Sequence, residues 1–236
     1  MRPYARFLSD ELARRIIDEA FRVLEVHGVH VHHPGLRARM EQAGFRVEHS
    51  EELLFIRRDQ AEAALGHAPE QAQLFTRESA LHVTLGGDQV HFTPASSALF
   101  ILDHRTGYRR KATTADLADY ARVVNGLAHI TYPSTAFSTV DVPQSIADAW
   151  RLYVLLAHGP RPPVSGAFTP HGVPVMGEIM QLFRRDRDDL RSRPLALFTI
   201  CPTSPLRWNE DSSQNLLDCI EWGIPVEFVP VQLMGL

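Results

Sequence analysis

The sequence predicts an α/β protein: about half of a (β/α)8 TIM-type barrel, preceded by an amino-terminal α+β extension. From about residue 96, strand-like apolar runs alternate with amphipathic segments roughly every 30 residues, which is typical of βα units and a parallel sheet. Before that point the predicted elements are short and mixed. Five strands and four helices are too few to close an eight-stranded barrel. We therefore expect an extension over residues 1–95 and an incomplete barrel over residues 96–236.

Local signals define the elements of the extension. Ser9 is a good N-cap, Asp10 and Glu11 occupy the first turn, and apolar residues at helical spacing predict a helix that stops at Gly28. Alternation of valine and histidine after that glycine predicts a short strand. The remaining predictions are a helix at 36–43, a strand pair within 45–56, a helical segment at 59–65, and a hairpin of 81–85 with 90–93.

The barrel region is more regular. Thr113 and Asp116 resemble a capping box, which predicts the start of its first helix. The chain ends on the apolar segment 232–236 directly after a strand, so we expect the edge of the parallel sheet to be incomplete. The predicted strands lie at 98–102, 130–137, 163–168, 195–201 and 226–231, and the later helices lie near 146–154, 175–183 and 216–220.

Composition excludes several classes of protein. The 236 residues are 44% hydrophobic and 22% charged, as in ordinary soluble domains. A net charge of −4 with dispersed basic residues argues against nucleic-acid binding, and no apolar run is long enough for a membrane helix. No secretory signal is recognisable, and Cys201 and Cys219 cannot form a disulfide framework, so we expect a cytoplasmic protein. Lysine Schiff-base chemistry is confined to Lys111, the only lysine.

Polar residues at the carboxyl ends of the predicted strands are the candidates for a binding site, because barrel active sites lie there. The polar residues at all five strand ends include few carboxylates and many small hydroxyls or amides, which would suit a neutral or cationic small molecule; they are Asp103, Ser138, Asp141, Thr169, His171, Cys201, Thr203, Ser204 and Gln232. The alternative is that most of these residues cap helices, as Asp103 and Ser204 could do. The substrate-binding candidates are Asp103, Asp141, Phe168, Thr169, Cys201, Ser204 and Gln232.

Other catalytic patterns are weak. Four histidines lie between His27 and His33, but without a convergent carboxylate or thiolate they favour a solvated strand edge over a metal site, and we expect no metal. Ser165 lacks the glycine pattern of a nucleophile elbow. A structural role is favoured over a catalytic thiol for Cys201.

In collinear order, these stretches resemble the amino-terminal half of the trimethylamine methyltransferase family. The resemblance covers nearly all of the chain, and its most specific parts are the Asp-Thr-Gly-Arg-Arg block and CPTSPL. The matching segments are LSDELARRIIDEAFRVLEVHGVHV, LDHRTGYRRKATTADLADYARVVNGLAHI, STVDVPQ, RPPVSGAF, ICPTSPLRWNED and GIPVEFVPVQLMG.

The resemblance implies a (β/α)8 barrel about twice this length. It also implies methyl transfer from trimethylamine, or from a quaternary amine such as glycine betaine, to the Co(I) of a separate corrinoid (cobalamin) protein. No cofactor is then expected on this chain itself. The partners are the cognate corrinoid protein and a small methylated amine, with a homo-oligomer possible. No position corresponding to the pyrrolysine of trimethylamine enzymes is covered.

Aromatic faces are the usual holders of methylammonium cations. The aromatic candidates near strand ends are Tyr132, Phe137, Phe168 and Phe198, although a core role is favoured for them.

Two further hypotheses compete with the methyltransferase. One is a non-catalytic remnant or subunit that folds by pairing with another half-barrel. The other, an unrelated barrel lyase or decarboxylase, is disfavoured because no carboxylate pair or lysine is suitably placed.

Overall fold

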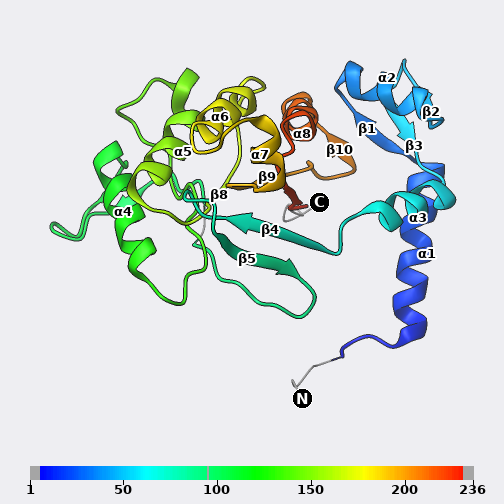
Figure 1. Cartoon of the computed structure of the whole chain (residues 1–236). Coiled ribbons are helices and arrows are strands. Elements are labelled where there is room, and N and C mark those ends of the chain that lie inside the picture. The colour runs from blue at the N-terminus through cyan, green and yellow to red at the C-terminus, as the bar shows by residue number, and fades with distance from the viewer. Residues whose placement is uncertain (1–5, 95, 231–236) are drawn as a thin grey trace. The chain divides into compact units, whose positions relative to one another are not determined.

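The computed structural model describes residues 6–94 and 96–230, which form two compact units (Figure 1). The smaller unit contains residues 6–68 and 203–209, and the larger unit contains the rest. The contacts therefore divide the chain after residue 68, ahead of the division after residue 95 that the sequence predicts. The chain is a mixed α/β protein with several separate sheets.

The predicted elements of the smaller unit are confirmed. The hydroxyl of Ser9 accepts a hydrogen bond from the backbone N–H of Leu12 at 3.2 Å, which caps the first helix. Gly28 has a φ of +72°, and a Cβ there would lie 2.8 Å from the carbonyl oxygen of Leu54, so this stop requires glycine. The elements are α1 (Asp10–Val26), β1 (Val29–Val31), α2 (Pro34–Gln42), β2 (Arg46–Glu48), β3 (Leu53–Phe55) and α3 (Arg58–His67).

A strand from much later in the sequence completes this sheet. β10 (Arg207–Trp208) pairs in parallel with β1, so that His30 lies opposite Arg207. The strand order is β10-β1-β3-β2. Residues 203–209 show no strand pattern of their own, and the pairing is therefore a product of tertiary structure.

In the larger unit, the predicted pairing of 81–85 with 90–93 is wrong. β5 (Leu81–Gly86) pairs instead with the preceding strand, β4 (Gln71–Phe75), across a turn in which Ser79 has a φ of +66°. Apolar residues explain this choice: Leu74 and Val83 are buried in one cluster with residues of the later strands.

Parallel contacts follow one another in chain order across the larger unit. β8 (Val164–Ser165), β9 (Leu197–Ile200) and β11 (Val226–Phe228) form a parallel sheet in the order β11-β9-β8. Isolated parallel bridges extend this succession, from Ser134 to Val164 and from Phe137 to Ala98. None of the sheets in the described part of the chain closes into a barrel.

Two predicted strands are largely replaced by these bridges. The segment 130–137 forms no continuous strand, and of the segment 98–102 only β6 (Ile101–Leu102) is a strand. β6 pairs antiparallel with β7 (Arg109–Arg110), as a short ribbon outside the parallel sheet. Whether these segments form continuous strands depends on pairing partners that are distant in sequence, and the apolar periodicity of a segment does not identify those partners.

The helices lie where the sequence predicts them, with one addition. The backbone N–H of Thr113 donates to Asp116 at 2.8 Å, which confirms the capping box at the start of α4. α7 is the helix that the sequence analysis missed. The helices are α4 (Thr114–Gly126), α5 (Ala147–His158), α6 (Gly172–Gln181), α7 (Arg187–Ser192) and α8 (Glu210–Trp222), with a 3-10 turn at Gln144–Ile146.

The core of the larger unit lies on both faces of the parallel sheet. Phe198 packs into a cluster with helix residues such as Leu152 and Met176. Its neighbour Leu197 points the other way, into the cluster that contains Leu74 of the β4–β5 hairpin. The strand β9 is therefore covered on both sides, as its continuous apolar sequence predicts.

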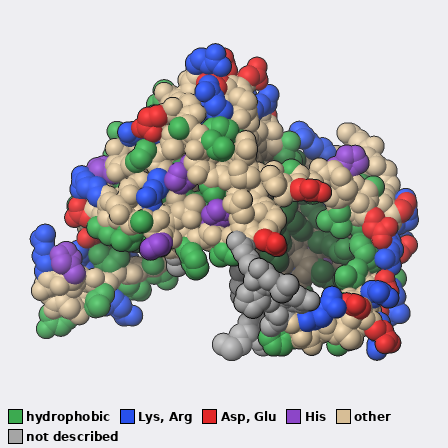
Figure 2. All heavy atoms as spheres, turned by 60° about the horizontal axis from the view of Figure 1, so that its bottom comes forward, with side chains coloured by type: hydrophobic (Ala, Val, Ile, Leu, Met, Phe, Trp, Pro, Cys, Tyr) green, Lys and Arg blue, Asp and Glu red, His purple; other side chains and the backbone are tan. Residues whose placement is uncertain are grey.

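No helix in residues 6–94 or 96–230 has both the length and the apolar character needed to cross a membrane. On the face shown in Figure 2, basic and acidic side chains are interspersed. This mixture agrees with the dispersed charge of the sequence.

Close packing between α6 and α8 generates the first prediction. Gly177 lies against the indole ring of Trp222, and an added Cβ would overlap that ring. Gly177→Ala should therefore lower the free energy of unfolding by about 1–3 kcal/mol. Gly126→Ala is the matched control, because no atom outside its chain neighbours and its own helix backbone lies within 4 Å of the Cβ position. The control should stabilise by about 0.5 kcal/mol, and equal urea midpoints for the two variants would contradict the packing.

Candidate functional site

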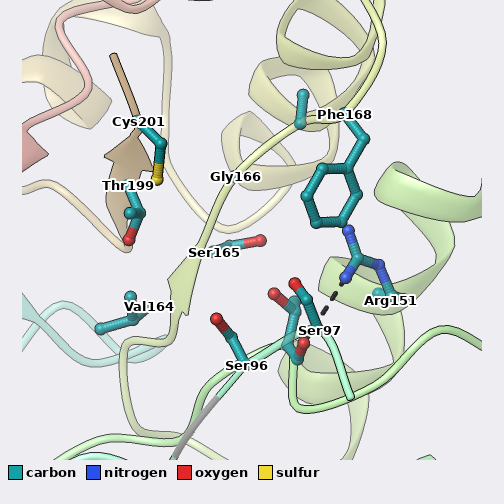
Figure 3. A pocket seen from close by; sticks show the side chains of 11 residues that line it. Ser96, Ser97, Arg151, Val164, Ser165, Gly166, Phe168, Thr199 and Cys201 are labelled. Atoms are coloured by element: carbon teal, nitrogen blue, oxygen red, sulfur yellow. Dashed lines mark hydrogen bonds between the residues drawn. The ribbon is translucent and has the colours of Figure 1, made fainter. Parts of the chain in front are cut away.

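Two neighbouring cavities in the larger unit share Arg151 and Phe168, and together they form the candidate site. The first, which we call the inner cavity, has a volume of about 100 Å³. The second, the outer cavity, has a volume of about 250 Å³. Besides the shared pair, the inner cavity is lined by Ser96, Ser97, Thr135, Val164, Ser165, Gly166, Ala167, Thr199 and Cys201 (Figure 3). The outer cavity is lined by Ser138, Thr139, Val142, Gln144, Ala147, Asp148 and Thr169.

A buried ion pair on α5 organises both cavities. Arg151 and Asp148 lie one helical turn apart, their N···O distance is 2.8 Å, and their side chains are 1% and 7% exposed. Desolvation lowers the pKa of Arg151, while the adjacent Asp148 carboxylate opposes that shift. Because a buried charge is stable only when it is paired and hydrogen-bonded, each partner depends on the other.

Asp148 also positions the loop that follows β8. Its Oδ2 accepts hydrogen bonds from the backbone N–H groups of Phe168 at 2.8 Å and Thr169 at 3.2 Å, and from the Thr169 hydroxyl at 3.3 Å. Its Oδ1 accepts from Arg151. Both carboxylate oxygens are thus engaged, and the loop after β8 is attached to α5.

The Phe168 ring is partly committed to Arg151. The guanidinium carbon lies 4.8 Å from the ring centroid, a cation–π arrangement, although Phe168 is 60% exposed. One face of the ring therefore already holds a cation. The other aromatic candidates, Tyr132, Phe137 and Phe198, are buried members of the hydrophobic clusters, as the core alternative predicts.

Three of the seven buried hydrogen-bonding side-chain atoms that have no partner among the described residues belong to residues that line these cavities. Arg151 Nε, Ser165 Oγ and Thr139 Oγ1 bond to no other described group. Figure 3 shows the Ser165 hydroxyl and the Arg151 guanidinium facing the same space. Unsatisfied buried polar atoms are costly, and in native proteins they call for a function or a bound molecule.

The opposite wall of the inner cavity is formed by Thr199 and Cys201 (Figure 3). The Thr199 hydroxyl donates a 2.5 Å hydrogen bond to the Glu227 carboxylate on β11. Desolvation and the negative charge of Glu227 raise the pKa of the Cys201 thiol. The thiol is therefore protonated at neutral pH, which disfavours its use as a nucleophile.

The structure brings together three of the seven candidate residues. Phe168 lines both cavities, Thr169 lines the outer one and Cys201 lines the inner one. Ser204 belongs to the smaller unit, and because α8 begins at Glu210, Ser204 does not cap it. Gln232 lies outside the described residues.

Asp103 and Asp141 line neither cavity and stabilise local structure. Asp103 accepts from the backbone N–H groups of residues 105 and 106 and from Arg110 Nε at 2.7 Å, so it closes a turn and does not cap a helix. Arg110 also forms two 2.7 Å hydrogen bonds with Asp116. Asp141 accepts from the backbone N–H of Thr114 at 3.0 Å, at the first turn of α4.

The sequence analysis did not identify Asp148, Arg151 and Ser165 as site residues. A signal was present for the first two: they are the only charged residues in the largely apolar helix segment ADAWRLYVLLA. A pair of opposite charges at i and i+3 in such a segment indicates a buried ion pair. Ser165 carried no such signal, because its importance depends on the side chain of Arg151.

The histidines of the smaller unit serve local structure. His33 Nδ1 accepts from the backbone N–H of Leu36 at 3.0 Å and caps α2, while His32 Nδ1 lies 2.6 Å from a carboxylate oxygen of Glu52. Within residues 6–94 and 96–230, no three His, Cys, Asp or Glu side chains converge as metal ligands would.

Comparison with known proteins adds evolutionary evidence. A sequence model of the family described as trimethylamine methyltransferase (MTTB) matches residues 1–236. Trimethylamine methyltransferase MttB of Desulfitobacterium hafniense (strain DSM 10664 / DCB-2) is 25% identical over 227 residues, covering 96% of this chain and 46% of that protein. Glycine betaine methyltransferase of Desulfitobacterium hafniense (strain Y51) is 22% identical over 234 residues, which cover 99% of this chain and 48% of that protein. Trimethylamine methyltransferase MttB of Methanosarcina barkeri is 24% identical over 241 residues, which cover 97% of this chain and 47% of that protein. This chain thus spans about half the length of these relatives.

The Arg151–Asp148 pair generates the second prediction. Asp148→Asn keeps a hydrogen-bond acceptor for the loop but leaves the Arg151 charge uncompensated, so it should lower the free energy of unfolding by about 3–5 kcal/mol. The double variant Asp148→Asn/Arg151→Gln removes both charges and should recover part of that loss. Urea titration of the single and double variants measures the coupling, and strictly additive losses would contradict a dependent pair.

The Asp103 contacts generate the third prediction. The hydrogen bond from Arg110, followed by those from the backbone of Arg105 and Thr106, lowers the pKa of Asp103 from 3.8 to about 2. A lowered pKa gives stability that is present above pH 4 and is lost as the pH falls toward 2. Asp103→Asn should therefore be less stable than the natural chain at pH 7, and the difference should narrow below pH 4. Urea titrations from pH 7 to pH 3 test this, with Asp119→Asn as the control for net charge. A difference independent of pH would contradict it.

Proposed function

Because the chain belongs to the trimethylamine methyltransferase family, we propose that it takes part in methyl transfer from a methylated amine to a corrinoid carried by a separate protein. Relatives named for trimethylamine and for glycine betaine define the range of proposed substrates. The corrinoid would supply the nucleophilic cobalt, and this chain would help to bind and orient the amine.

The position of the inner cavity is the observation that carries this proposal. Phe168 lies just after β8 and Cys201 just after β9, so the cavity opens at the carboxyl ends of two neighbouring parallel strands. That edge is where barrel enzymes bind their substrates. The chain-ordered parallel contacts support the related proposal that the larger unit is an arc of a (β/α)8 barrel.

The side chains around the inner cavity suit the binding of a methylated ammonium group. A methylated ammonium group is a poor electrophile until water is excluded and the group is held in line with its attacker. The exposed side of the Phe168 ring offers an aromatic surface, and Glu227 places negative charge behind Thr199. We propose that these groups attract and orient the cation, while the shaped cavity displaces water.

A second candidate follows from the unclosed sheet and the half-length match to the relatives. In it, the chain is a subunit or a non-catalytic remnant, and a second copy or another polypeptide provides the remaining strands. A homo-oligomer would be one such arrangement.

We also propose a cytoplasmic location and a role in methanogenesis. The free thiols of Cys201 and Cys219 support a reducing compartment.

The fourth prediction tests the transfer directly. The chain is mixed with cob(I)alamin and either glycine betaine or trimethylamine, and loss of the Co(I) absorption is followed. A methyltransferase should consume Co(I) with at least one amine. Phe168→Ala should slow it about tenfold by removing the aromatic contact. Asp119→Asn, an exposed position outside both cavities, is the control and should leave the rate unchanged.

Gel filtration over a range of chain concentrations separates the two candidates. A rate that appears only where the chain dimerises supports assembly from two copies. No consumption of Co(I) with either amine at any concentration would contradict transfer by this chain, and would leave only the subunit or remnant.

A further inference from the structure

We infer that the β6–β7 ribbon is a docking surface for an acidic face of the protein that carries the corrinoid, an assignment that rests on the proposed function. The ribbon is the segment 99–111, which contains both strands and the turn between them. In Figure 1 it is the loop that projects beside α4. Its position, its two faces and its unpaired charges support this role.

The ribbon arises at the same edge of the sheet as the candidate site. Just before it, Ala98 forms a parallel bridge with Phe137, and just after it, Ala112 forms one with Thr139. The backbone N–H of Ser138 donates to the carbonyl oxygen of Ala98 at 3.4 Å. Ser138 and Thr139 line the outer cavity. A partner that brings cobalt to an amine held at this edge would therefore pass close to the ribbon.

One face of the ribbon is fixed to the fold. The carboxylate of Asp103 accepts from Arg110 Nε at 2.7 Å and from backbone N–H groups of the turn. Arg110 also donates to Asp116, at the start of α4, through two bonds of 2.7 Å. Ile101, which lies opposite Arg110, packs against a hydrophobic cluster that includes residues of α4 and α5. The ribbon is therefore ordered before any partner binds, which lowers the entropic cost of docking.

The other face is apolar, basic and exposed. Because side chains alternate across a strand, Phe100 and Leu102 lie on the face opposite Ile101. Arg109, which pairs with Leu102, and Lys111 share that face. The guanidinium carbon of Arg109 lies 4.5 Å from the Phe100 ring centroid, in agreement with this arrangement, and Leu102 is 72% exposed. Exposed apolar side chains grouped with arginine are typical of protein interfaces.

Three exposed cations of the ribbon form no ion pair with any described residue. They are Arg105, Arg109 and Lys111. The acids of the ribbon and of α4 are already paired. Asp103 and Asp116 bind Arg110. Asp119 binds Arg122. A surface rich in carboxylates would therefore complement the ribbon, and such complementarity mainly steers a partner toward the site and fixes its orientation.

The apolar part of this surface favours a protein over a nucleic acid. The aliphatic side chain of Leu102 offers no stacking surface to a base, and three cations contact few phosphates. Tyr108, beside the turn, is 77% exposed, and tyrosine often carries binding energy at protein interfaces. The expected partner surface is therefore a ring of Asp and Glu side chains around an apolar centre.

The fifth prediction is tested by calorimetric titration of the whole chain, without amine. The probes are the corrinoid-binding proteins of the same organism, each produced with bound hydroxocobalamin, and at least one should bind. Arg109→Glu/Lys111→Glu reverses two exposed charges outside any ion pair, so thermal unfolding should change little while the Kd rises about tenfold. Arg14→Glu/Arg15→Glu is the matched control. It makes the same change in net charge at exposed positions of α1 and should leave the Kd unchanged.

Two further measurements examine the charged and the apolar parts of the surface separately. Raising the salt concentration from about 0.05 to about 0.3 M should weaken binding of the natural chain more than binding of the charge-reversed variant, because salt screens the cations that the variant lacks. Leu102→Ser removes the exposed apolar contact without a change in charge. It should raise the Kd at both salt concentrations.

The outcomes separate the docking surface from the proposed function. If a corrinoid protein binds the natural chain and the charge-reversed variant equally, the ribbon is refuted as the docking surface while methyl transfer stands. If no corrinoid protein binds, the ribbon is refuted as well, and consumption of free cob(I)alamin still tests the transfer. Two other results would also overturn the assignment. One is a dimer of the chain that charge reversal dissociates, and the other is binding of duplex DNA that depends on the same cations.

Discussion

The buried pair of Arg151 and Asp148 is the constraint on which the candidate site depends. Two opposite charges inside a mostly apolar helix would be destabilising if either were unpaired. Their other bonds explain why the pair is tolerated: Asp148 accepts from the loop after β8, and Arg151 contacts the backbone of Thr135 and the ring of Phe168. The pair thereby joins a helix, a strand-end loop and a neighbouring chain segment. The walls of both cavities follow from that connection.

The surrounding fold holds the residues of the candidate site in fixed relative positions. Helix residues pack on one face of the parallel sheet and the β4–β5 hairpin packs on the other, so alternate residues of β9 are buried in different clusters. Rigid strands then present Thr199 and Ser165 at fixed positions beside the cavity. Because the site lies at the carboxyl edge of strands, it could gain further walls from additional βα units without a change in its own geometry. This agrees with a chain that spans half the length of its relatives.

Polar residues of similar appearance turn out to have different roles. Both carboxylate oxygens of Asp103 and of Asp141 accept hydrogen bonds from nearby groups of the chain, and these local bonds explain their presence without a ligand. Ser165 and Arg151 are the reverse case, since their bonding capacity exceeds what the described chain supplies. An excess of buried donors is a more specific sign of a binding site than the position of a polar residue near a strand end.

The sequence by itself determined what depends on near neighbours in the chain. The Ser9 cap, the Thr113–Asp116 capping box, the helical faces and the apolar strand β9 were all predictable, because caps and periodicity act over a few residues. Only the tertiary structure decided that residues 203–209 pair with β1, that β5 pairs with β4, and that Ser165 faces Arg151. Those outcomes arise from contacts between segments distant in sequence, whose energies come from burial and geometry that no local pattern records.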